Sequence, residues 1–126
     1  MIILYINCKL FPFVEWILYG LKAYETRNHN TLKNLVGKQV YLAATGKGKR
    51  PVIYGSCTIT GSITVTDKRT YNRYRNQTCI EKGSCYDFTG STKQKVLYRL
   101  DNVQRCKPFP IPENVVRHGR IYCETV

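Results

Sequence analysis

Acidic residues, histidines and long apolar runs are all scarce in this sequence of 126 residues. No stretch approaches the roughly 18 uncharged apolar residues that a membrane-spanning helix needs, so no span is expected. The two histidines show no recognisable spacing to a serine or cysteine nucleophile, which argues against a histidine-dependent nucleophilic enzyme. The G-x-x-x-x-G-K-[ST] pattern of a P-loop is missing, so triphosphate binding of that kind is not indicated.

The shortage of acidic residues leaves a large positive charge. Twenty Lys and Arg residues stand against eight Asp and Glu residues, for a formal net charge of +12. A field of that size favours an anionic partner. The length and the 43% hydrophobic content fit one folded domain spanning residues 1–126.

Cysteine is present six times, but never as a Cys-x-x-Cys pair. Met1–Ile6 is apolar with no basic residue before it, so it is interpreted as a strand rather than a signal peptide. Reduced thiols in a cytoplasmic protein, acting as small buried hydrophobes, are therefore expected, and no cofactor is. The alternative is a zinc site that combines Cys79 and Cys85 with His118 or Cys123.

Apolar spacing predicts one early helix and several strands. The helix is expected to begin at Pro12 and to end at Gly20. Its buried stripe would consist of Phe13, Trp16, Ile17 and Leu21. Strands are predicted at Gln39–Ala44, Val52–Thr66 (long and bent, or a hairpin), Val96–Leu100, Asn102–Cys106 and Arg120–Cys123.

Glycines and prolines modify this pattern. Gly55 and Gly61 are expected at bulges or points of close approach within the long strand. The prolines at 108, 110 and 112 are expected to exclude regular structure. Residues 67–92 are polar and predict a short helix followed by a loop excursion. The fold class is therefore α+β and mostly β, as a small curled sheet or barrel with helical cover.

One segment resembles a known family. Residues Gly20 to Arg27 have the pattern G-x-K-x-x-E-x-R directly after the predicted helix, which resembles the signature of the ASCH domain, a PUA-like family. Ala43–Thr45 with its following Gly/Lys loop, and Pro110 to Gly119, are similar to two further conserved blocks. The resemblance covers most of the chain, with residues 67–92 unmatched.

The resemblance implies a barrel of about five or six strands with helices at its ends, and a cleft for RNA or a nucleobase-like ligand. Lys22, Glu25 and Arg27 fall on the polar positions of the signature. Some small bacterial members look like amidohydrolases of acetylated cytidine, with a threonine nucleophile where Glu25 stands. A carboxylate would not reproduce the acyl transfer that a hydroxyl performs.

The residues of this segment have a chemistry of their own. In an extended segment, Glu25 and Arg27 share one face, where a carboxylate accepts hydrogen bonds from a base edge and a guanidinium donates to a phosphate or carbonyl. Lys22 adds a charge that reaches a phosphate, or loses its proton if buried. The structural alternative is a partly buried ion pair between Glu25 and Arg27 that braces the sheet.

Two basic segments are candidates for contacts with phosphates. The loop from Thr45 to Arg50 carries two glycines with Lys47 and Lys49, which would let backbone N–H groups and cations face an anion. Residues 68–76 interleave cations, among them Arg73 and Arg75, with two tyrosines, as in surfaces where bases stack. Solvated cations and tyrosines that anchor the loop remain the alternative for this segment.

Three functional interpretations follow. The first is an ASCH-like domain that binds RNA or a modified nucleobase, with Lys22, Glu25 and Arg27 in the cleft and the basic loops on phosphates. The second is a small hydrolase of a modified nucleoside such as N4-acetylcytidine, or a ribonuclease, in which Lys22 and Glu25 transfer protons; His118 is a further acid-base candidate. The third is a module that binds an acidic protein. The oligomeric state is left open.

Overall fold

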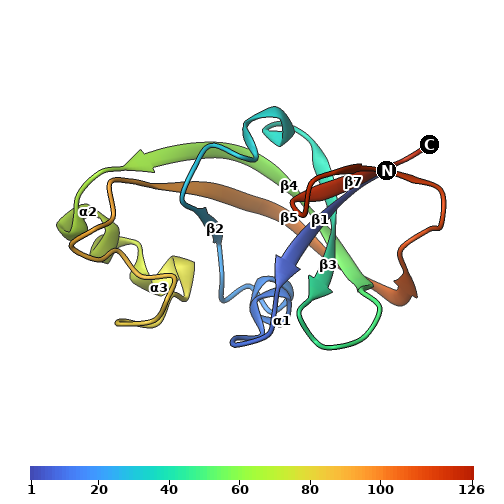
Figure 1. The fold of residues 1–126 in the computed structure, drawn as a ribbon, viewed down its shortest axis with the longest axis horizontal. Coiled ribbons are helices and arrows are strands. Elements are labelled where there is room, and N and C mark those ends of the chain that lie inside the picture. The colour runs from blue at the N-terminus through green and yellow to red at the C-terminus, as the bar shows by residue number, and fades with distance from the viewer.

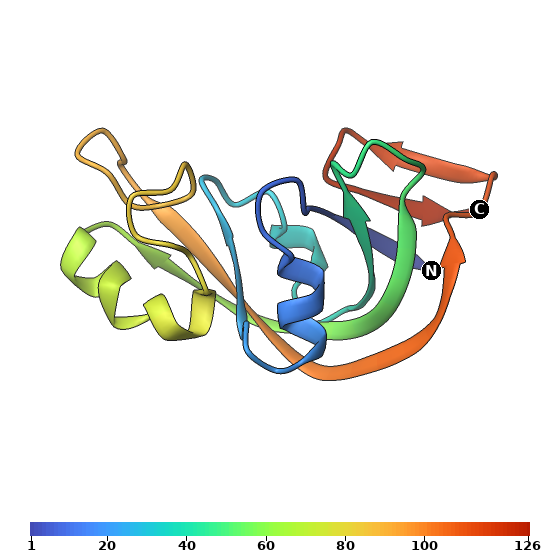
Figure 2. The same ribbon diagram turned by 90° about the horizontal axis from the view of Figure 1, so that it is seen from below.

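The computed structural model describes all residues, 1–126, and its seven strands form one mixed sheet. The strand order is β2-β5-β4-β3-β1-β7-β6, and β1 and β3 are the parallel pair. Figures 1 and 2 show how the long strands β4 and β5 curve around the shorter elements. The bounds are β1 Ile2–Asn7, α1 Phe13–Leu18, β2 Tyr24–Arg27, the 3-10 helix η1 Lys33–Leu35, β3 Gln39–Thr45, β4 Val52–Val65, α2 Lys68–Arg73, α3 Arg75–Thr78, β5 Lys95–Pro110, β6 Val115–His118 and β7 Tyr122–Thr125.

The predicted small barrel is wrong in two respects. The sheet has seven strands rather than five or six, and β2 and β6 remain its edges, so it does not close. The gap between β2 and β1 is bridged by a side chain: the Arg27 guanidinium donates from Nη2 to the carbonyl oxygen of Tyr5 at 3.1 Å. The mostly β composition with short helices is confirmed.

The bend of β4 comes from irregular pairing. Its register with β5 shifts between Ile53 and Gly55 and again between Ile59 and Gly61, as expected for both glycines. At Gly55, a Cβ atom would strike the carbonyl oxygen of Gln104 and a methyl group of Leu18. Only glycine therefore allows this close approach of the two long strands.

The expectation that the prolines at 108 and 110 exclude regular structure is wrong. β5 is one strand that continues through Pro108 to Pro110, where it pairs with Val52. β2 covers only the first part of β5, so the region around Pro108 lies at an edge, where no ladder partner needs its missing N–H. The predicted last strand is present as β7, but its hairpin partner β6 was not predicted.

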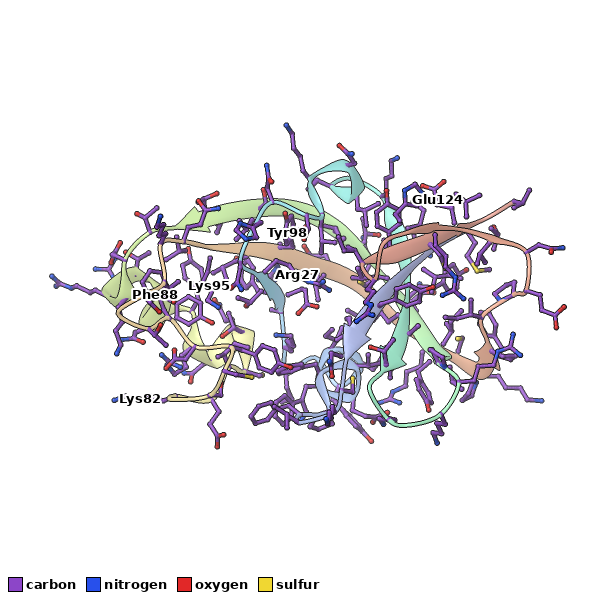
Figure 3. All side chains as sticks on the ribbon, in the orientation of Figure 1. Arg27, Lys82, Phe88, Lys95, Tyr98 and Glu124 are labelled. Carbon is purple, nitrogen blue, oxygen red and sulfur yellow. The ribbon has the colours of Figure 1, made fainter.

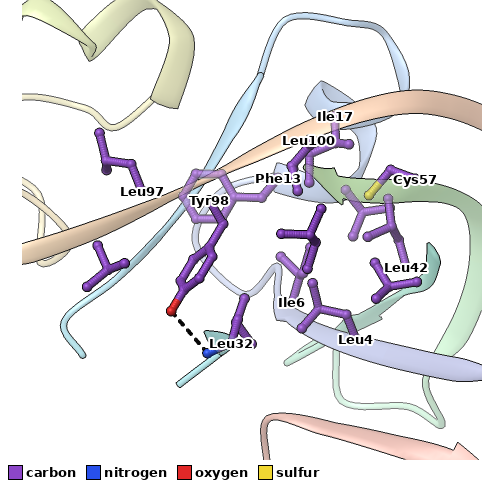
Figure 4. Close-up of a cluster of buried hydrophobic side chains, with 14 of the residues drawn as sticks. Leu4, Ile6, Phe13, Ile17, Leu32, Leu42, Cys57, Leu97, Tyr98 and Leu100 are labelled. Atoms are coloured by element: carbon purple, nitrogen blue, oxygen red, sulfur yellow. Dashed lines mark hydrogen bonds between the residues drawn. The ribbon is translucent and has the colours of Figure 1, made fainter. Parts of the chain in front are cut away.

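The central strands carry apolar residues on both faces. In β1, Leu4 and Ile6 enter the main core with the helix α1, and Ile3 enters a smaller cluster on the opposite face. This explains why the segment is continuously apolar, since a strand buried on both sides has no polar face. Figure 4 shows the main cluster, in which the Tyr98 hydroxyl accepts a hydrogen bond from the Leu32 N–H at 3.1 Å.

The helix α1 is shorter than its apolar stripe suggested. Phe13 and Ile17 are buried as predicted and Trp16 is partly buried, but Leu21 is exposed. The chain leaves the helix through Gly20, whose φ of +80° is in the left-handed region that favours glycine. Leu21 consequently points off the helical face on which the sequence pattern placed it.

Residues 67–92 form two short helices and a loop at one end of the molecule (Figure 1). Asp67 caps α2 by accepting a hydrogen bond from the Thr70 N–H at 2.7 Å. Tyr71 is fully buried against Phe88, so this tyrosine anchors the segment instead of offering a stacking surface. No helix in the structure is long and apolar enough to cross a membrane.

Candidate functional site

A cavity of about 460 Å³ opens between β1, β2 and the loop that follows α3; we call it the cleft. It lies where β1 and β2 come close without pairing with each other, beside the hydrogen bond from Arg27 to the Tyr5 carbonyl oxygen. Figure 3 shows Lys95 next to Phe88, and Arg27 farther from that residue, near Tyr98. Its wall includes Tyr5, Ile6, Asn7, Phe13, Glu25, Thr26, Arg27, Asn28, Thr45, Ile80, Cys85, Tyr86, Lys95 and Arg120.

Glu25 and Arg27 lie together in the wall of the cleft. They are two residues apart in β2, so strand alternation places both on one face, as predicted. Arg27 Nη2 donates to Glu25 Oε2 at 3.0 Å, and Glu25 Oε1 accepts from the Thr26 N–H at 3.2 Å. The Glu25 side chain is 7% exposed and that of Arg27 is 21% exposed. The ion pair is therefore held rigidly, with the guanidinium closer to solvent.

Lys22 lies behind this pair and not in the wall of the cleft. Its side chain is 0% exposed, and Nζ is 3.8 Å from Glu25 Oε1. Nζ also donates to the Thr78 carbonyl oxygen at 2.6 Å and stands 4.6 Å from the centre of the Phe13 ring. Burial lowers the pKa of the Lys22 ammonium, while the charge of Glu25 acts in the opposite direction. The three predicted residues are thus brought together, but only two of them face the opening.

The pair retains unused hydrogen-bonding capacity. An ionised carboxylate offers about four acceptor positions, and the Arg27 and Thr26 donors occupy two of those on Glu25. A guanidinium has about five N–H donors, and Nη2 of Arg27 uses two, one to Tyr5 and one to Glu25. The cleft therefore presents adjacent acceptors and donors in a fixed arrangement.

Several residues of the cleft were not predicted. Lys95 is buried and donates from Nζ to Asn28 Oδ1 at 2.7 Å, and burial lowers its pKa. Tyr86 contributes an aromatic ring, packed 5.4 Å from the ring of Phe13. Both residues belong to or follow the polar segment 67–92, where no periodic pattern pointed to a site. The sequence signal there was limited to the aromatic residue at position 86.

The residues of the loop between β3 and β4 differ in whether they line a cavity. Thr45 lines the cleft, and its role as a ligand contact stays a prediction. Arg50 lies outside the cleft, and its Nη2 donates to the carbonyl oxygen of Ile111 at 3.3 Å. Lys47 and Lys49 are exposed and line no cavity. The structure thus does not bring all the cations of this loop into the site.

Arg73 and Arg75 have different roles despite their proximity in sequence. Arg73 is exposed. Arg75 Nη2 forms an ion pair with Asp87 Oδ1 at 2.9 Å, and Nη1 donates to the Ile80 carbonyl oxygen at 3.1 Å. Arg75 therefore holds α3 against the following loop with part of its donors, and its assignment as a phosphate contact stays a prediction.

The cysteines do not assemble a metal site. All six are free, and no group of three or more His, Cys, Asp or Glu residues is placed to hold a metal ion. Cys79 Sγ donates to the Leu21 carbonyl oxygen at 3.2 Å. Cys79 and Cys85 are therefore not grouped with His118 or Cys123 as the alternative zinc site required.

Comparison with known proteins gives one consistent likeness. No protein-family model and no curated protein matches the chain. Among solved structures, ASCH from Zymomonas mobilis has 15% identity and a TM-score of 0.67, and covers 87% of this chain and 73% of its own. Two ZmASCH mutant proteins from the same organism have 16% and 17% identity, both with a TM-score of 0.69. They cover 87% and 86% of this chain, and 75% and 72% of their own.

The likeness extends over 86 to 87% of the chain. At identities of 15 to 17%, it concerns the arrangement of the backbone. The resemblance noted for the G-x-K-x-x-E-x-R segment is thereby confirmed at the level of the fold. The chain has an ASCH-like fold.

Proposed function

We propose that the protein binds RNA or a modified nucleobase, with the base held in the cleft by Glu25 and Arg27. The observation that carries the proposal is the fixed ion pair in the cleft wall, with free acceptor positions on one partner and free donors on the other. A nucleobase edge carries this combination of donors and acceptors. The cavity volume of about 460 Å³ lies within the range of small-ligand sites.

Two neighbouring features support a base as the ligand. Tyr86 offers an aromatic ring in the wall, and base stacking on aromatic rings contributes about 1 to 3 kcal/mol per base. Lys95 and Arg120 add positive charge to the same wall, and Lys22 adds a buried charge behind it. Glu25 is the only carboxylate of the wall, so the cleft has an excess of cations that suits a ligand with a phosphate.

The role of Lys22 is that of a positioning residue. Its ammonium is fully covered and 3.8 Å from Glu25, so a ligand would meet the carboxylate and not the amine. The ammonium attracts the carboxylate from the side away from the cleft and so helps to fix its position. The exposed Lys47, Lys49 and Arg73 contribute to the general field that attracts an anion.

The test is an NMR titration with nucleosides and with a short single-stranded RNA, comparing the wild type with Glu25→Gln. The amide change keeps the size of the side chain but removes its charge and half of its acceptors. We expect chemical-shift changes in residues 22–28 and 85–86 for the wild type, and at least a tenfold weaker affinity for the variant, as for a lost charged hydrogen bond.

Glu81→Gln is the matched control, because Glu81 is exposed and lines no cavity. It removes the same charge from the chain without touching the cleft. A control variant that loses as much affinity as Glu25→Gln, or shifts confined to surfaces outside the cleft, would reject the assignment. Thermal unfolding of both variants establishes that the native fold is retained.

A hydrolase is the second candidate, favoured by the buried Lys22. An amine whose pKa is lowered by burial is suited to accept a proton, and Glu25 lies between it and the cleft. Incubation with N4-acetylcytidine and with a labelled short RNA tests this alternative, with Lys22→Met as the comparison. Product from the wild type and not from the variant supports it, and no product above a blank removes it.

A further inference from the structure

A second cavity, of about 510 Å³, lies next to the cleft and has a different character. Three arginines, Arg50, Arg117 and Arg120, line it, and Glu113 is its one carboxylate. We call this cavity the arginine groove. Its positive charge is mostly uncompensated, because no ion pair joins Glu113 to any of the three guanidinium groups.

The fold builds the groove from segments that are distant in sequence. Arg117 belongs to β6, and Arg120 follows the turn between β6 and β7, in which Gly119 has a φ of +62°. Arg50 ends the loop before β4 and is held by its hydrogen bond to the Ile111 carbonyl oxygen. Arg117 and Arg120 donate to no protein group, so their planar N–H forks remain free for a ligand.

The groove and the cleft share part of their walls. Tyr5, Thr45 and Arg120 line both cavities, so the two cavities adjoin each other at these residues. A free nucleoside would fill the cleft with its base and sugar, but it has no phosphate that could enter the arginine groove. In a single-stranded polynucleotide, each internal nucleoside has a phosphate on either side. One guanidinium group can donate two parallel hydrogen bonds to the oxygens of a phosphate.

We propose that the arginine groove binds backbone phosphates of a single-stranded polynucleotide whose adjoining nucleotide occupies the cleft. This inference rests on the proposed function and defines its ligand class as an oligonucleotide in place of a free nucleoside. Arg120 borders both cavities, and Arg50 and Arg117 define the extension.

The experiment measures the binding of fluorescently labelled single-stranded RNA and DNA hexamers of mixed sequence by anisotropy, at several salt concentrations. Nucleoside binding is followed with cytidine and adenosine. The test variant is Arg50→Gln with Arg117→Gln, because neither residue lines the cleft. Lys33→Gln with Lys38→Gln is the matched control, because both lysines are exposed and line no cavity. The two substitutions remove the same charge as those in the test variant.

We expect the test variant to bind the hexamer about tenfold more weakly near 50 mM salt. The slope of log affinity against log salt should fall by about 1.4, from about 0.7 for each of two lost phosphate contacts on a single strand. The control should change the affinity less than about twofold, and both variants should bind nucleosides like the wild type. Arg117→Gln alone, which breaks no protein hydrogen bond, should reduce the slope by about 0.7.

The outcomes separate this inference from the proposed function. Hexamer binding that is sensitive to Glu25→Gln but not to the arginine variants overturns the groove alone. Hexamer binding that is sensitive to the arginine variants but not to Glu25→Gln overturns the role of the cleft alone. Equal losses in the lysine control, equal affinity for polyglutamate of the same charge, or no hexamer binding by the wild type also overturns the groove. Comparison of the RNA and DNA arms identifies which strand is preferred.

Discussion

The cleft and the arginine groove adjoin each other but differ in whether their charged side chains have partners within the protein. In the cleft, the carboxylate of Glu25 stands between two cations, one fully buried and one at the opening, and each has a fixed partner. In the groove, Arg117 and Arg120 have no partner within the protein. The same fold thus contains a compensated ion-pair cluster at Glu25 and an uncompensated group of arginines, and Arg120 lines both cavities.

The difference indicates that the two sites recognise different parts of a ligand. Buried charges must be paired, because an isolated ion loses far more hydration energy than the fold can supply. Their geometry is therefore rigid, which suits recognition of a particular base edge. Exposed arginines need no partner for stability and remain available to a phosphate, which makes their contribution dependent on salt.

The largest expected effect comes from breaking the compensated site. Glu25→Ala leaves Lys22 buried beside no carboxylate and removes the partner of Arg27. Loss of one partner of a buried pair destabilises a protein by about 3 to 5 kcal/mol. Urea unfolding measures the change in the free energy of unfolding. Glu113→Ala, at the rim of the groove, should change it by less than about 0.5 kcal/mol.

Adding Lys22→Met to Glu25→Ala sharpens this test. If the uncompensated ammonium causes the loss, the double variant should recover part of the stability that Glu25→Ala removed. A double variant that is less stable than the single one would mean that packing around Glu25, and not its charge, holds the site together.

A smaller effect on stability is expected from Arg75, which is ion-paired, and almost none from the exposed Arg73. Arg75→Gln should cost about 2 kcal/mol, because it leaves the buried Asp87 carboxylate without its ion-pair partner. Arg73→Gln, two residues away and exposed, should change the free energy of unfolding by less than about 0.5 kcal/mol. Thermal unfolding of both variants makes the comparison, and equal effects would contradict the distinction.

The pH dependence of stability gives a further test of burial. Because burial lowers the pKa of Lys22 below its ordinary 10.5, the unfolded chain binds more protons than the folded one between the two values. The contribution of Lys22 to the free energy of unfolding should therefore rise with pH in that window. Subtracting the curve of Lys22→Met from that of the wild type cancels the titration of buried tyrosines and cysteines. A difference that is flat or falls with pH contradicts the assignment.

The smallest effect concerns the uncompensated site. Arg117→Gln with Arg120→Gln should alter the free energy of unfolding by less than about 0.5 kcal/mol, with stabilisation as the expected sign, because like charges are removed from a chain with a net charge of +12. Added salt should raise the melting temperature of the wild type more than that of the variant, because salt screens this repulsion. A large loss of stability would mean that the arginines support the hairpin.

Local patterns in the sequence predicted much of the fold and the centre of the site. The helix at Pro12, the strands β1 and β3, the bulges at Gly55 and Gly61 and the shared face of Glu25 and Arg27 all depend on neighbours within a few residues. Leu21 and Pro108 were misjudged for a related reason. Whether a helix ends one turn early, or a strand lies at an edge, is decided by what packs beside it.

The sequence by itself determined the positive charge, the mostly β composition and the strand that carries the acid and the guanidinium, because these follow from residue types and short-range periodicity. Only the tertiary structure decided that Lys22 is buried, since the carbonyl oxygen that holds it belongs to Thr78. It also decided that Arg75 is engaged by Asp87, and that Arg117 and Arg120 meet Arg50 beside the cleft. Contacts between distant segments form only when the sheet curves, and no spacing along the chain records that curvature.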